Sequence, residues 1–147
     1  MKTNIDHIQS EVFGPLNPAS TDILEGRCEI SKSDISVMIQ AEIENATRDQ
    51  WLKTVTICEK IFMNLSEDII SSFRDVLGTR VTSAAFGPIG QEVGGDAKGL
   101  SEDLRLRKVM FFENGGCLFW ASPNYIPDME LSLQFDLNFD VEEIIVW

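Results

Sequence analysis

The most constraining feature of this chain is a strict alternation of apolar and polar residues near its C-terminus. The apolar members are Met129, Leu131, Leu133, Phe135, Leu137, Phe139 and Val141, and the polar members are Glu130, Ser132, Gln134, Asp136, Asn138, Asp140 and Glu142. Successive side chains of an extended chain point to opposite sides, so this pattern buries one whole face only in a β-strand. It predicts one long strand, or a strand that bends near Leu137 and Asn138. Residues 144–147 then pack at an end or form a short further strand.

Alternation also occurs near the N-terminus. Residues 24–30 and 35–43 alternate on either side of Ser31, Lys32 and Ser33, which is typical of a β-hairpin. Residues 1–22 contain Gly-Pro and Asn-Pro pairs, and we expect them to be extended and turn-like.

A helical period follows this hairpin. Thr47 and Gln50 have the spacing of a capping box, and the apolar residues after them recur at intervals of three and four. Ser66, followed by two acidic residues, is expected to begin a second helix, and Gly78 is its expected end. Residues 79–86 fit either an extension of that helix or a short strand.

The segment at residues 87–99, GPIGQEVGGDAKG, is rich in glycine but lacks the spacing of a phosphate-binding loop. Lys98 is followed by Gly99 rather than by Ser or Thr, and no Gly-x-Gly-x-x-Gly occurs. We expect a connector that is more mobile than the elements it joins, and a partner could order it.

Two strands are predicted after this connector. Residues 104–111 alternate imperfectly, and the slip at Arg107 and Lys108 indicates a bulge. Asn114 and Gly115 form a hairpin turn signal, with a return strand at residues 117–122. The predicted order is therefore ββ-αα-βββ. For these 147 residues we expect a single domain, residues 1–147, of the α+β class: a two-layer, mostly antiparallel sheet with a helix pair on one face.

Charge limits the partners of this domain. Twenty-four acidic against twelve basic residues give a net charge of −12, which opposes binding to nucleic acid and attracts a cationic protein. The sequence has no apolar run of secretory or membrane-spanning length. We therefore expect a cytoplasmic protein with no membrane or nucleic-acid partner.

Catalytic and metal-binding patterns are weak. Cys28, Cys58 and Cys117 are odd in number and lie far apart in apolar segments, which favours reduced core cysteines over disulfides or zinc. His7 is the only histidine, and Cys117 has no neighbouring base. Residues 136–140 match the first three ligand positions of a calcium loop, but Val141 stands where glycine is required. We expect no enzyme activity, cofactor or metal.

The polar face of the C-terminal strand is the candidate binding site. If its apolar members pack on the helices, Glu130, Asp136, Asp140 and Glu142 project from the other side as an acidic row. This row fits a docking surface for a basic protein. The alternative is a solvated face whose charge is partly balanced by basic residues at 105, 107 and 108 on a neighbouring strand.

The order of elements also resembles that of a group of small bacterial domains. The residues that carry this resemblance are Phe13-Gly14-Pro15-Leu16, Leu24-Glu25-Gly26 and the closing strand QFDLNFDVEEIIVW. Several such domains are similar to immunity proteins of polymorphic or contact-dependent toxin systems. The resemblance implies a non-enzymatic protein that binds and neutralises a cationic toxin domain.

Two other classes of function stay open. One is a small enzyme or ligand-binding protein with a pocket between sheet and helices, using Tyr125, Trp120 or scattered carboxylates. The other is a scaffold that self-associates through a sheet edge or exposed aromatic residues. Oligomeric state and strand order are left undetermined.

Overall fold

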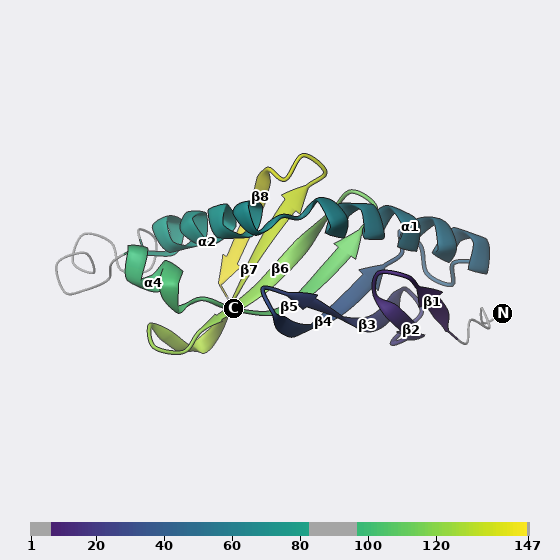
Figure 1. The fold of residues 1–147 in the computed structure, drawn as a ribbon, viewed down its shortest axis with the longest axis horizontal. Coiled ribbons are helices and arrows are strands. Elements are labelled where there is room, and N and C mark those ends of the chain that lie inside the picture. Colours follow the sequence, from purple (N-terminus) through teal and green to yellow (C-terminus); the bar gives the residue numbers. More distant parts are fainter. Residues whose placement is uncertain (1–6, 83–96, 147) are drawn as a thin grey trace.

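An eight-stranded sheet carries the fold, and its strands lie in sequence order from one edge to the other (Figure 1). The computed structural model describes residues 7–82 and 97–146. Its strands are β1 (Ile8–Ser10), β2 (Gly14–Pro18), β3 (Ile23–Ile30), β4 (Ser33–Gln40), β5 (Arg105–Phe112), β6 (Gly115–Ser122), β7 (Ile126–Asp136) and β8 (Val141–Val146).

The helices of the described chain lie between β4 and β5. They are α1 (Arg48–Asn64), α2 (Glu67–Val81) and α4 (Ala97–Asp103). β4 and β5 pair in parallel, whereas every other neighbouring pair is antiparallel. A parallel pair needs a long crossover connection, and this crossover carries α1 and α2 across one face of the sheet (Figure 1).

The predicted α+β class and mostly antiparallel sheet are confirmed, but the order ββ-αα-βββ has too few strands. Two extra strands, β1 and β2, lie within the segment expected to be turn-like, where Ile8 pairs with Leu16 and both side chains are fully buried. Phe13, in the turn between them, stacks on Phe111 of β5. Burial of these apolar side chains against the core offsets the weak strand propensity of a Gly- and Pro-containing segment.

The C-terminal alternation divides into β7 and β8, which pair antiparallel. The predicted bend is therefore a hairpin turn. The Asp136 carboxylate accepts hydrogen bonds from the backbone N–H groups of Asn138 (2.8 Å) and Asp140 (3.0 Å), and Phe139 adopts a φ of 62°. An aspartate that accepts from backbone groups two residues ahead is a common device for reversing the chain.

Local signals for the helix starts are confirmed. Thr47 and Gln50 form both hydrogen bonds of a capping box, and the Ser66 hydroxyl accepts from Ile69 N–H. Gly78 does not end α2. Leu77 and Val81 are both buried, so continuing the helix past Gly78 buries more of the same apolar stripe, and this outweighs the propensity of glycine to stop it.

For residues 79–86 the sequence left two alternatives, an extension of the second helix or a short strand, and the described residues decide between them only up to Thr82. Residues 79–81 belong to α2, and Thr82 keeps helical backbone angles. In the segment expected to be a connector, residues 97–99 form the first turn of α4. Residues 83–96 lie outside the described residues.

The predicted hairpins and the bulge of β5 are confirmed. The β3–β4 turn consists of Ser31 and Lys32, with φ of 52° and 66°. The pairing of β5 with β6 shifts between Leu106 and Lys108. The β5–β6 turn has Glu113 and Asn114 at its centre, because Gly115 already pairs with Phe112. This turn is therefore one residue earlier than predicted.

Two aromatic clusters join the helices to the sheet. Phe62 of α1 packs edge-on against Phe13 and Phe111, at centroid distances of 5.3 and 6.0 Å. Further along, Phe73 of α2 stacks on Phe135 of β7 at 5.4 Å. Aromatic pairs at these distances add to the area that their burial removes from water, so they hold α1 over β5 and α2 over β7.

A buried carboxylate connects α4 to the end of β6 and to the turn that follows it. Asp103, at the end of α4, accepts hydrogen bonds from the Ser122 hydroxyl (2.7 Å) and from the backbone N–H (2.9 Å) and side-chain Nδ2 (2.7 Å) of Asn124. The Ser122 hydroxyl, followed by the two Asn124 donors and the nearby charge of Arg105, holds the pKa of Asp103 below its ordinary value, although burial acts in the opposite direction.

Replacing Phe111 by alanine tests the first aromatic cluster. Phe111 is completely buried, so F111A leaves a cavity and is expected to lower the free energy of unfolding by about 3–5 kcal/mol. The measurement is chemical denaturation. The control M63A, at a position 71% exposed on α1, is expected to stay within about 0.5 kcal/mol of the wild type. Equal losses in both variants would contradict the central role of the cluster.

Replacing Asp103 by asparagine tests the buried carboxylate. An amide offers one acceptor oxygen and turns an NH₂ toward donors, so D103N is expected to unfold at lower denaturant concentration at neutral pH. Because the folded-state pKa lies below the ordinary value of 3.8, the advantage of the wild type is complete above that pH and disappears as the pH falls through the folded-state pKa. D128N, at an exposed aspartate, serves as the control. A D103N deficit that is independent of acid pH would contradict this account.

Candidate functional site

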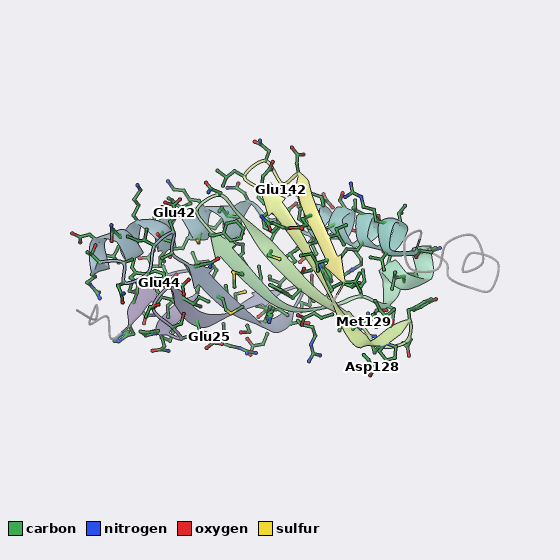
Figure 2. All side chains as sticks on the ribbon, turned by 180° about the vertical axis from the view of Figure 1, so that it is seen from behind. Glu25, Glu42, Glu44, Asp128, Met129 and Glu142 are labelled. Atoms are coloured by element: carbon green, nitrogen blue, oxygen red, sulfur yellow. The ribbon has the colours of Figure 1, made fainter. Side chains whose placement is uncertain are left out.

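The face of the sheet turned away from α1 and α2 is the largest candidate surface. Figure 2 shows the molecule from this side, with the strands in front of the helices. We call it the open face and define it by the residues that the strand register places on it. Its apolar members are Met38, Met110, Phe112, Cys117, Phe119, Ala121 and Ile145, all of them partly exposed.

The register shows that these side chains are neighbours. In one row across the sheet, Met38 of β4 pairs with Met110 of β5, which pairs with Cys117 of β6. In the adjacent row, Phe119 of β6 pairs with Ser132 of β7, which pairs with Ile145 of β8. Directly paired residues point to the same side of a sheet, so the apolar side chains of β4, β5, β6 and β8 form a band, with the polar Ser132 of β7 between Phe119 and Ile145.

Acidic groups flank this band. Glu25, labelled in Figure 2, pairs with Met38 on one side. On the other side Gln134 pairs with Glu143, and Glu130 pairs with Ala121. The band is thus apolar at its centre and negatively charged at its margins.

Three basic residues that the register places on the open face have partners within the chain. Arg105, which pairs with Ala121, donates to the backbone carbonyl oxygens of Glu102 and Leu104. Arg27 forms an ion pair with Asp34 at 2.9 Å, and the Lys108 ammonium lies 4.6 Å from the centroid of the Phe119 ring. The second contact is a cation–π interaction, which uses the charge of Lys108 within the band. The marginal carboxylates Glu25, Glu130 and Glu143 form no ion pair with any described residue.

The four acidic residues predicted from the sequence do not form one row. Glu130 and Asp136 lie on β7 at alternate positions whose side chains point to the open face. The Asp136 carboxylate, however, organises the turn that contains Asp140. Glu142 is the extra residue between two pairs of the β7–β8 ladder and lines, with Arg80 of α2, a pocket of about 530 Å³. The hairpin turn breaks the row because it reverses the chain, and the extra residue Glu142 shifts the pairing so that Glu143, opposite Gln134, lies on the open face.

Sequence analysis missed the apolar band, although a signal for it exists. Residues 109–112 and 117–121 are continuous apolar runs rather than alternations. A strand that is apolar on both sides is typical of a sheet covered on both faces. Since the described helices lie on one face only, these runs indicate a second face with apolar character.

The cysteines are not activated. Burial raises the pKa of Cys117 to about 11; a hydrogen bond with Ser132 lowers it in part, and the charges of Glu130 and Glu143 raise it. Burial also raises the pKa of Cys28 to about 11 and that of Cys58 to about 12. A thiol is nucleophilic as its thiolate, so these three side chains are neutral at physiological pH.

One pair of carboxylates, which the sequence did not single out, meets in the structure. Glu113, in the β5–β6 turn, and Glu42, after β4, line a pocket of about 220 Å³ together with Lys53 of α1. Burial raises the pKa of Glu113, the charge of Glu42 and a hydrogen bond with it raise that pKa further, and Lys53 lowers it. The pair shares a proton more readily than isolated glutamates do.

Over residues 7–82 and 97–146, no group of three or more His, Cys, Asp or Glu side chains is arranged to hold a metal ion. Within the same ranges, no helix has the length and apolarity needed to cross a membrane.

Comparisons with known proteins do not assign this surface. A scan against protein-family models, a search of curated proteins and a search of solved structures find no significant match. The chemistry of the molecule's own surfaces is therefore the basis for a functional proposal.

Replacing Glu113 by glutamine tests the carboxylate pair. Because the folded-state pKa of Glu113 is raised, ionisation of this residue opposes folding once the pH exceeds its ordinary value of 4.5. E113Q removes that charge and can donate its amide to Glu42, so it is expected to raise the free energy of unfolding at neutral pH. The gain should vanish as the pH falls below 4.5.

The control for this substitution is E44Q, which removes a charge at an exposed position nearby. Denaturant unfolding at several pH values gives the comparison. A loss of stability in E113Q at neutral pH, or an equal gain in E44Q, would show that Glu42 and Glu113 are not coupled.

Proposed function

We propose that this chain is a non-enzymatic binding protein whose open face docks on a cationic partner protein. The observation that carries the proposal is an apolar band on the side of the sheet that the described helices leave uncovered, with carboxylates at its margins that form no ion pair with any described residue. A two-layer arrangement, in which the helix pair covers one face and the partner the other, is part of this proposal, as is a cytoplasmic location.

The two parts of the surface have different roles in docking. Phe119 and Met110 are partly exposed apolar side chains at the centre of the band, and such central anchors supply most of the binding energy in protein interfaces. Glu130 and Glu143, at the margin, act over longer distance and accelerate the encounter with a positively charged surface.

The net charge of −12 extends this complementarity to the whole molecule. Together with the resemblance to small bacterial immunity proteins, it favours a toxin domain as the cationic partner. In this role the chain neutralises the toxin by covering part of its surface, and its own residues perform no chemistry.

Charge reversal and apolar disruption on the open face test the proposal. The binding partner to assay is a purified basic toxin domain, chosen by testing the protein encoded by the neighbouring reading frame first, with association and dissociation followed by surface plasmon resonance. F119E is expected to weaken binding about thirtyfold or more, because it removes a central anchor. E130K and E143K are expected to lower the association rate and to flatten its salt dependence, with little change in dissociation.

The matched control is D68K, which makes the same change of charge at an exposed position of α2 on the helix side. Unchanged binding by F119E, or an equal loss of association rate in D68K, would remove the open face from the interface. Light scattering adds a second check: a wild-type dimer that F119E converts to a monomer would identify a second copy of this chain as the occupant and contradict the proposal.

A further inference from the structure

A pocket not described above lies on the helix side of the sheet, away from the open face. It has a volume of about 260 Å³ and opens between α2, the β3–β4 turn and the start of β5. Its lining combines aliphatic side chains with four polar residues, Ser31, Ser33, Arg74 and Arg105. The aliphatic residues used below are Ile35, Ile70, Leu104 and Leu106.

Arg74 is the unusual member of this pocket. Its guanidinium carbon lies 5.4 Å from the centroid of the Trp120 ring, and its Nε is buried with no hydrogen-bond partner in the structure. A charged donor that is buried without an acceptor destabilises the protein, so native structures almost always satisfy such groups. A ligand in the pocket would supply the acceptor that none of the described residues gives to the Nε of Arg74.

The carboxylates nearest in the fold are used elsewhere. Asp75 accepts from the Ser101 hydroxyl at 3.0 Å, and Glu67 accepts from the Ser31 hydroxyl at 2.8 Å. Asp103 is held by Ser122 and Asn124. In a chain with 24 acidic residues, Arg74 forms no ion pair with any described residue.

We propose that this pocket binds a small carboxylate with an aliphatic body. The guanidinium of Arg74 receives the carboxylate through paired N–H groups, and Ser33 supplies a hydroxyl beside it. The aliphatic part packs against Ile35, Ile70 and the leucines of the α4–β5 junction. A phosphate dianion fits less well, because the second arginine of the lining, Arg105, donates to the backbone carbonyl oxygens of Glu102 and Leu104, and the surrounding protein is strongly acidic.

This site is independent of the proposed docking function, because it lies on the opposite side of the sheet from the open face. A failure of the open face to bind a partner leaves the pocket untouched, and the reverse also holds.

Nuclear magnetic resonance of the whole chain tests the proposal. The probe is 4-methylpentanoate, titrated to millimolar concentration while the Nε–H signals of Arg74 and the indole N–H signal of Trp120 are followed. Both signals are expected to shift and to saturate. The neutral analogue 4-methylpentanamide is expected to leave them nearly unchanged, since it lacks the charge that Arg74 recognises.

Two variants and a control complete the design. R74M is expected to weaken binding roughly tenfold or more, followed by the Trp120 signal, and R74K by a smaller factor because lysine lacks the planar fork. The control R27M removes a guanidinium that is paired with Asp34 on the other face and is expected to bind like the wild type. If R74M fails to fold, R74K and the amide analogue keep the test valid.

Several results would overturn the proposal. One is the absence of any shift with 4-methylpentanoate at millimolar concentration, and another is an equal response to the amide. A third is that R74K and R74M both bind 4-methylpentanoate as tightly as the wild type does. Inorganic phosphate that shifts Arg74 as strongly as the carboxylate would also overturn it, since the aliphatic walls would then have no part in recognition.

Discussion

The parallel pairing of β4 and β5 is the constraint on which the rest of the structure depends. All other neighbours in the sheet can be joined by short turns, but a parallel pair cannot. After β4 the chain must run back over a face of the sheet to the end at which β4 began, so that β5 can start there. The helices occupy that crossover. Because α1 and α2 lie together on one face (Figure 1), no described helix covers the opposite face of the sheet.

This arrangement explains why the strands have two kinds of apolar side chain. Those that face the helices, such as Val109, Phe111 and Leu118, are completely buried. Their neighbours in the chain, such as Met110 and Phe119, lie on the open face and are only partly covered. An apolar face that no described helix covers is a recognised mark of an interaction surface, and the proposed docking function rests on this face and on the carboxylates at its margins.

Local features of the fold can be predicted from the sequence because their interactions lie within a few residues. The capping box at Thr47, the cap at Ser66 and the bulge after Leu106 are examples. Features that depend on distant contacts are harder to predict. Gly78 lies within a helix because Leu77 and Val81 need burial, and β1 and β2 form because Phe13 stacks on Phe111 from far along the chain.

The candidate site shows the same division. Glu130 was predictable as a member of an exposed polar face, because alternation alone determines the parity of a strand residue. The prediction named Glu142, but Glu143 lies on the open face instead. The bulge of the β7–β8 ladder shifts the alternation by one residue, and no local sequence signal predicts it. Arg74 and Trp120, and likewise Glu42 and Glu113, come from separate elements and meet only in the folded chain.

By itself, the sequence determined the acidic charge, the class of fold and the position of most strands and helices, because periodicity and capping act over one or two turns of chain. Only the tertiary structure decided which apolar side chains stay uncovered and which charged groups stay unpaired. That decision depends on the register of eight strands and on the path of one crossover, and both follow from contacts between residues far apart in the chain.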